Sequence, residues 1–262
     1  MFLSTKTAQL FSTTAALAAS LVLGGCEFID AFKDQGALVH VFTTHHATPE
    51  AGAFPNRGGD EKPRMFQNDE GWDITLTHGF VTTVGASLMN CDGSMMPVDL
   101  YWGQLPENLA AKDLQLEGVG GIQVPPGDYC GVVVEYGPYQ PGFIEDGDHE
   151  RPSTDRLDDA TVYIRGAAVK DGVHIQFEYA LADRASVDLD ITHIENGQPL
   201  HIADREPFPM DLTVSKTYDR FFDGLDFNDP SALEILQEQT LYVLEDETRI
   251  VLGTTPNAND IY

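Results

Sequence analysis

The amino-acid sequence predicts an all-β protein, an antiparallel β-sandwich with long acidic loops and one short helix near the C-terminus. Three observations favour this fold class. Many short segments alternate apolar and polar residues with the period of two that is typical of strands. These segments recur at a spacing of roughly 8–12 residues and are separated by turn-forming residues. The chain shows neither an internal repeat nor the strand–helix–strand alternation of parallel sheets.

The clearest predicted strand covers residues 72–88. One of its faces is apolar and is expected to be buried; it carries Trp72, Ile74, Leu76, His78 and Phe80. The dipeptide Asp171-Gly172 favours a type I′ turn and should join two further strands into a hairpin. Strands are also expected at 38–44, 98–102, 114–124, 129–136, 161–169, 172–181, 186–194, 210–214, 241–244 and 249–252.

The single predicted helix lies after these strands in the chain. Asp229 is a good N-cap, Pro230 suits the first turn, and residues 232–239 continue with helix-forming residues. The stretches 47–70 and 137–158 are rich in proline, glycine and charge, and they are expected to be long loops.

The first 25 residues are typical of an export signal. Lys6 precedes the apolar stretch 15–23, which is too short to span a bilayer. The segment ends in Leu23-Gly24-Gly25-Cys26, which resembles the lipobox of bacterial lipoproteins. We therefore expect the sulfur of Cys26 to carry the lipid, palmitate among its acyl chains. The alternative is an ordinary secretory signal with a chance cysteine.

The residues after this cysteine indicate where the protein is held. Glu27 stands where enterobacterial lipoproteins of the inner membrane have aspartate, so the outer membrane is expected, with the domain on its periplasmic face or at the cell surface. Residues 26–37 would be a tether, and residues 38–262 a single domain. No later segment has 18 consecutive apolar residues, so the lipid would be the membrane attachment.

The cysteine count indicates a disulfide bond. The chain has three cysteines, and once Cys26 is lipidated, Cys91 and Cys130 remain. Exported proteins fold under oxidising conditions. A Cys91–Cys130 disulfide is therefore predicted, with two buried free thiols as the alternative.

The charge of the chain argues against one class of partner. The formal net charge is −27, from 42 acidic and 15 basic residues, and no basic patch interrupts it. Nucleic-acid binding depends on Lys and Arg contacts to phosphates, so nucleic acid is not expected as a partner. Hydrophobic residues make up 42% of the chain, which is enough for a core, so the acidic residues are expected to form a solvated surface.

Sequence motifs of catalysis are absent. The chain has no Gly-x-Ser-x-Gly elbow, no phosphate-binding P-loop and no His-Glu-x-x-His zinc motif. A non-enzymatic function is therefore predicted; a hydrolase with two converging carboxylates in a cleft is an alternative. The acidic segments 146–150 and 219–229 lack the EF-hand spacing, so calcium binding there stays open.

Histidine provides the main candidate ligand set. An imidazole on a buried face needs a hydrogen-bond partner or a metal, and neutral imidazoles suit copper or zinc. Each histidine also has an ordinary interpretation as a core or surface residue. The thioethers of Met89, Met95 and Met96 either add Cu(I) ligands or fill the core. The candidate metal ligands are His40, His45, His46 and His78.

Three stretches resemble the MbnP-like proteins, a family of periplasmic, often lipid-anchored β-sandwich proteins linked to copper acquisition. The resemblance implies a sandwich fold and a copper site made with histidine and an oxidised tryptophan; Trp72 and Trp102 are the two tryptophans here. The stretches are residues 71–78 (GWDITLTH) with 84–88 (VGASL), 124–129 (VPPGDY), and 211–214 (DLTV) with 222–227 (FDGLDF).

These patterns together predict a lipid-anchored envelope protein that binds a ligand, with copper or another transition metal as the candidate. The alternative is a structural or surface-interaction lipoprotein without a metal site, which presents the loops 47–70 and 137–158 to another envelope protein. Imidazole nitrogens that converge within about 5 Å would favour the metal-binding function. Histidines scattered over both faces would favour the surface-interaction function.

Overall fold

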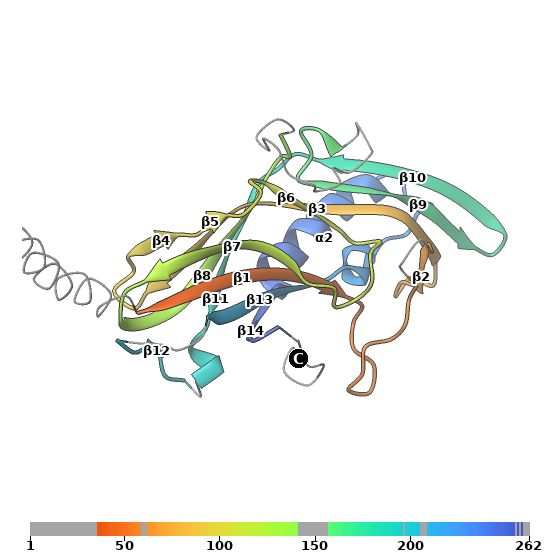
Figure 1. Cartoon of the computed structure of the whole chain (residues 1–262). Helices are drawn as coiled ribbons and strands as arrows, with labels where there is room; N and C mark the ends of the chain where they lie inside the picture. Colours follow the sequence, from red (N-terminus) through yellow and green to blue (C-terminus); the bar gives the residue numbers. More distant parts are fainter. Residues whose placement is uncertain are drawn as a thin grey trace, which may run out of the picture.

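The computed structural model describes residues 36–58, 62–140, 157–195, 197–204 and 209–254, together with residues 256 and 258. Within these residues the chain forms two β-sheets and one α-helix (Figure 1). The predicted all-β sandwich is confirmed. No helix in this part of the chain is both long and apolar enough to cross a membrane. The signal segment, Cys26, nearly all of the tether and the acidic segment 146–150 lie outside the described residues.

The smaller sheet has β1 at its centre and contains a parallel pair. β1 and β13 run parallel, whereas the other neighbours in this sheet are antiparallel. Figure 1 shows β1 and β13 side by side. A parallel pair requires a long crossover connection, and here most of the chain lies between the two strands. The strand order is β14 (Arg249–Leu252), β13 (Met210–Thr217), β1 (Ala37–His46), β7 (Glu117–Val124) and β5 (Asp99–Leu100).

The larger sheet is built around the 18-residue strand β3, and all of its pairs are antiparallel. Its central path is β10 (Val173–Leu181), β9 (Val162–Lys170), β3 (Asp73–Asn90), β8 (Gly127–Tyr136) and β11 (Ala185–Asp190). β2 (Arg64–Gln67), β4 (Met95–Pro97) and β6 (Leu105–Asn108) also pair with β3, and β12 (Leu200–Ile202) pairs with β8.

The main apolar core is shared by the two sheets. The alternation along β3 places Ile74 and Leu76 in it, as predicted, and Trp72, just before the strand, is completely buried. The smaller sheet contributes Val39 and Val41 of β1 to the same cluster. The hairpin between β9 and β10 turns at Asp171 and Gly172, both with positive φ, as the Asp-Gly signal predicted.

The prediction that His78 lies on the apolar face of β3 is wrong. The register between β3 and β9 shifts between Leu76 and His78, which is a β-bulge. An extra residue in one strand reverses the in–out alternation beyond it. Consequently Thr77 and His78 are both exposed, and Val81 takes the place on the core side that was predicted for Phe80. Phe80 is buried, but in a second, smaller cluster with Tyr139 and Tyr163.

The end of the chain also differs from the sequence prediction. Residues 241–244 are not a strand: α2 (Ala232–Tyr242) continues directly into a π-helical turn, η4 (Val243–Glu247). Their apolar run is ambiguous in sequence because buried helices and buried strands look alike over four residues. Asp229 is not the N-cap, which is Ser231; the Asp229 carboxylate instead accepts hydrogen bonds from the Ser231 amide and hydroxyl.

Three further boundaries need correction. The predicted loop 47–70 contains the strand β2. The predicted strand 186–194 ends at Asp190 and gives way to a 3₁₀ turn, η2 (Thr192–Glu195). The predicted strand 98–102 is reduced to Asp99–Leu100.

Candidate functional site

A group of ionised and polar side chains lies between the two sheets, where an apolar core would otherwise continue; most are buried, and Asp113 and Glu117 are half-buried. We call it the interlayer cluster; its members are Thr43, His45, Arg64, Glu107, Asp113, Glu117, Lys216 and Tyr218. β1 supplies Thr43 and His45 because they continue the inward-facing alternation of Val39 and Val41. Lys216 is the register partner of His45 in β13, so its side chain enters the same layer.

Glu107 of β6 lies at the centre of this cluster and has three partners. Its Oε2 lies 2.6 Å from Nζ of Lys216 and accepts a hydrogen bond of 2.7 Å from the hydroxyl of Thr43. Its Oε1 lies 2.9 Å from Nδ1 of His45. Burial by itself raises the pKa of Glu107, but the nearby charge of Lys216 and the contact with His45 outweigh it and lower the pKa to about 2. Glu107 is therefore a carboxylate, paired across the two sheets.

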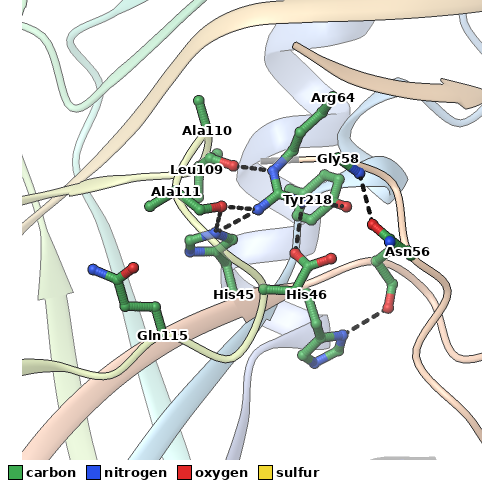
Figure 2. Close-up of polar contacts among 12 residues, drawn as sticks. His45, His46, Asn56, Gly58, Arg64, Leu109, Ala110, Ala111, Gln115 and Tyr218 are labelled. Carbon is green, nitrogen blue, oxygen red and sulfur yellow. Dashed lines mark hydrogen bonds and ion pairs between the residues drawn. The ribbon is translucent and has the colours of Figure 1, made fainter. Parts of the chain in front are cut away.

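Arg64 of β2 closes the cluster from the other side. Figure 2 shows its guanidinium directed at the carbonyl oxygens of Leu109 and Ala111 and at His45. Nη1 of Arg64 lies 2.7 Å from a carboxylate oxygen of Asp113 and donates to the hydroxyl of Tyr218 at 2.9 Å. The guanidinium carbon also lies 4.5 Å from the centre of the Tyr218 ring. A fully buried arginine thus has partners on every side.

Both ring nitrogens of His45 face polar partners. Oε1 of the Glu107 carboxylate can only accept, so Nδ1 carries a proton and donates it there. Nε2 lies 3.0 Å from Nη2 of Arg64 and 3.3 Å from the carbonyl oxygen of Ala111. Both ring nitrogens of His45 are occupied by protein partners.

Glu117 of β7 is the third acid of the cluster, beside Glu107 and Asp113. It is the register partner of Thr43 in β1 and faces the same layer. Burial, and then the negative charge of Glu107, raise the pKa of Glu117 to about 7, although Lys216 opposes the shift. Glu107 is thus ionised at neutral pH, whereas Glu117 is close to half-protonated.

The four predicted metal ligands are not brought together. His40 points to the outer side of the smaller sheet, where Nδ1 lies 3.2 Å from Asp211 and the ring packs edge-on against Tyr101. His45 lies on the inner side of the same strand, five residues further, which is roughly 16 Å along an extended chain. His78 is exposed in the other sheet. Among the described residues, no three His, Cys, Asp or Glu side chains are arranged to hold a metal ion.

His46 differs from the other three histidines. It ends β1, is completely buried, and lies against the ring of Phe54 with centroids 4.7 Å apart. Nδ1 lies 2.8 Å from the carbonyl oxygen of Ala47, whereas Nε2 has no hydrogen-bond partner among the described residues. Burial lowers the pKa of His46 to about 4, so the ring is neutral at neutral pH.

The predicted disulfide is confirmed. Cys91 and Cys130 are joined, with their Cα atoms 4.9 Å apart, at the end of β3 and in β8. Of the three methionines, Met89 and Met95 are register partners in β3 and β4, and Met96 packs against the core.

Carboxylates of the acidic segment 219–229 accept hydrogen bonds from residues of neighbouring segments. Asp219 accepts from the amide and hydroxyl of Thr48. Asp226 accepts from the indole N–H of Trp72 at 3.1 Å. These carboxylates hold the segment against the strands, which is an ordinary structural role for an acidic loop.

Comparisons with known proteins give one distant match. No family model matches the chain, and no curated protein matches it. Among solved structures, MbnP from Methylosinus trichosporium aligns with a TM-score of 0.35 and 13% sequence identity, over 70% of this chain and 76% of that chain. This is a distant structural resemblance.

Sequence reasoning missed the interlayer cluster, apart from His45. One signal was present: Lys216 interrupts an otherwise buried strand, β13, and buried lysines are rare unless they are paired. The partner could not be read from the sequence, because Glu107 belongs to a different sheet.

Proposed function

We propose that the protein is an exported, lipid-anchored protein of the bacterial envelope that acts by binding rather than by catalysis. The observation that carries this proposal is the Cys91–Cys130 disulfide, because stable disulfides form mainly in oxidising compartments. The chain has three cysteines, so the cysteine left outside the bridge is Cys26, at the end of the signal-like segment. This arrangement supports lipidation of Cys26, and Glu27, the residue that follows it, supports an outer-membrane location.

Metabolic labelling with an alkyne-tagged palmitate tests the anchor. The full-length chain should be labelled and should fractionate with the outer membrane. Cys26→Ala should lose the label, whereas Cys91→Ser/Cys130→Ser, the matched control, should keep it. Equal labelling of the wild-type and Cys26→Ala chains, or a wild-type chain that stays unprocessed in the cytosol, would contradict the proposal.

Binding to another envelope protein is the role that the placement of the histidines supports best. His40 and His45 lie on opposite sides of the smaller sheet and His78 lies in the other sheet, which is the scattered arrangement expected of an interaction protein. The described part of the loop 47–70 is exposed from Glu50 to Ala53 and offers a surface for such contact.

A photo-crosslinking amino acid placed at Ala53 tests this role in living cells. Val173, 43% exposed at the start of β10, is the matched control position. We expect a discrete adduct with an envelope protein from position 53 and none from position 173. Adducts of equal yield and pattern from both positions would indicate non-specific proximity and overturn the assignment of this loop.

Copper is the second candidate ligand, and one observation favours it at His46. Metal-binding histidines usually donate one ring N–H to a carbonyl and offer the other nitrogen to the metal. His46 has this arrangement, with Nδ1 at the Ala47 carbonyl and an Nε2 that has no partner in the part of the chain that the structure describes. Calorimetric titration with copper should therefore show binding that His46→Ala abolishes and His78→Ala leaves unchanged. Binding of equal strength in His46→Ala would rule this candidate out.

A further inference from the structure

Lys216 and Glu107 form an ion pair that is out of reach of water. Each side chain is 1% exposed, and Nζ lies 2.6 Å from Oε2. Lys216 belongs to β13 of the smaller sheet and Glu107 to β6 of the larger one, so the pair spans the sandwich. Removing two charges from water costs several kcal/mol per ion before their attraction offsets it. Burial by itself lowers the pKa of Lys216, but the charge of Glu107 outweighs it and raises that pKa, so the two side chains are held as an ion pair. An amide bond between them would carry no charge and would avoid this cost.

We propose that Lys216 and Glu107 condense to an intramolecular amide bond that joins the two sheets covalently. The ammonium of Lys216 first transfers one proton to the carboxylate of Glu107. The neutral Nζ then attacks Cδ of Glu107, a C–N bond forms, and one carboxyl oxygen leaves as water with the second proton taken from Nζ. An ammonium and a carboxylate thus become one amide and one water molecule, without an oxidant, a reductant or a co-substrate.

The side chains around the pair suit each stage of this reaction. The hydroxyl of Thr43 donates to Oε2 of Glu107 and accepts from Nζ of Lys216, so it holds the nucleophile against the carboxyl group. The N–H of His45 at Oε1 is placed to stabilise the negative oxygen of the tetrahedral intermediate. Nζ of Lys216 also lies 5.7 Å from the centre of the Tyr136 ring, a fully buried aromatic that helps to exclude water.

Glu117 is a further titratable acid of this layer, and in the proposed reaction it would relay the proton between the attacking nitrogen and the leaving oxygen. It faces the same layer as Thr43, and it feels the charges of both Glu107 and Lys216. A relay must be able both to give and to accept a proton, which is most effective when its pKa is near the working pH. The pKa of Glu117, raised to about 7, meets this condition.

Peptide mass spectrometry of the full-length protein, purified after export and then denatured, reduced, alkylated and digested with trypsin, tests the bond directly. Trypsin does not cut after an acylated lysine. The digest should therefore contain fragment 206–220, uncut at Lys216, joined to fragment 65–112, with a mass one water lighter than the two fragments together. Recovery of fragment 206–216, cut after an unmodified Lys216, as the main product would overturn the proposal.

Two variants test separately whether the amide bond forms at Lys216 and whether Glu117 relays the proton. Lys216→Arg keeps the positive charge but should give no joined fragments, because a guanidinium does not condense with a carboxyl group under these conditions. Glu117→Gln keeps the pair intact and should leave most chains unjoined. Joined fragments in Lys216→Arg would show that another lysine is involved, and full joining in Glu117→Gln would overturn the role of Glu117. The wild-type digest decides the proposal even if Lys216→Arg fails to fold.

Discussion

The guanidinium of Arg64 lies 2.7 Å from the carboxylate of Asp113, with the arginine completely buried at the edge of the larger sheet. The same guanidinium donates hydrogen bonds to the carbonyl oxygens of Leu109 and Ala111. Arg64 therefore fixes the segment that follows β6 against β2. Its position is decided by these polar partners and not by the apolar packing that fixes most of the core.

Arg64→Met should lower the free energy of unfolding by about 3–5 kcal/mol, because it leaves a carboxylate and two carbonyl groups without their buried donor. Urea denaturation followed by circular dichroism measures the change. Met65→Ala is the matched control: the neighbouring side chain is 64% exposed, and its loss should change stability by less than about 0.5 kcal/mol. Equal effects of both substitutions would contradict the structural role of Arg64.

Loss of the disulfide should also destabilise the fold. Cys91 and Cys130 are separated by 39 residues, and a loop of this length restricts the unfolded chain enough to contribute about 4 kcal/mol. Cys91→Ser/Cys130→Ser should unfold at a correspondingly lower urea concentration, and reductant should shift the wild-type midpoint to that of the variant. A wild-type midpoint that is indifferent to a reductant strong enough to open the bond would contradict this expectation.

Much of the fold follows from local patterns that the sequence displays openly. The hairpin at Asp171 requires two positive φ values, which the Asp-Gly pair signals. The buried face of β3 follows from the alternation through Ile74 and Leu76. The disulfide followed from counting cysteines in a chain that is expected to be exported. Each of these features depends on neighbouring residues or on composition alone.

The interlayer cluster depends on which strands face each other across the sandwich, and the sequence does not encode that relation locally. Lys216 and Glu107 meet because β13 lies parallel to β1 and β6 pairs with β3. The position of His78 was mispredicted for a related reason. The residues up to Leu76 alternate regularly, so nothing in that pattern indicates that a β-bulge follows and exchanges the two faces of the strand.

Glu117 should make the protein less stable as the pH rises. Its pKa is raised to about 7 in the folded chain, above its unfolded value, so between about pH 4.5 and 7 the folded state holds a proton that the unfolded state has lost. Stability from this group is therefore present at low pH and is lost towards neutrality, by up to about 3 kcal/mol. Glu117→Gln should not show this loss. Parallel pH profiles of the two proteins, measured by urea denaturation, would contradict the prediction.

His46 should have the opposite dependence on pH. The pKa of His46 is lowered from 6.5 to about 4 in the folded chain. Between these two pH values the unfolded state therefore binds a proton at this residue, whereas the folded state does not. Stability is lost as the pH falls from about 6.5 to 4, by up to about 3 kcal/mol. His46→Phe keeps a ring against Phe54 and should remove this part of the slope. A titration midpoint of the His46 ring above about 6, measured by NMR, would contradict the burial argument.

Gly120 should be essential for the edge of the smaller sheet. A Cβ atom at this position of β7 would lie 2.3 Å from the carbonyl oxygen of Asp99 and 2.7 Å from a methyl carbon of Val98. The clash is with backbone, so it cannot be relieved by a change of rotamer, and Gly120→Ala should cost about 1–3 kcal/mol and separate β5 from β7. Gly127→Ala is the matched control, because the nearest atom to its Cβ is a ring carbon of Tyr129 at 3.9 Å. Hydrogen exchange should show faster exchange at the Tyr101 amide, which donates to Val119, in Gly120→Ala only. Unchanged protection there in a stable Gly120→Ala protein would mean that β5 can shift to admit the methyl group.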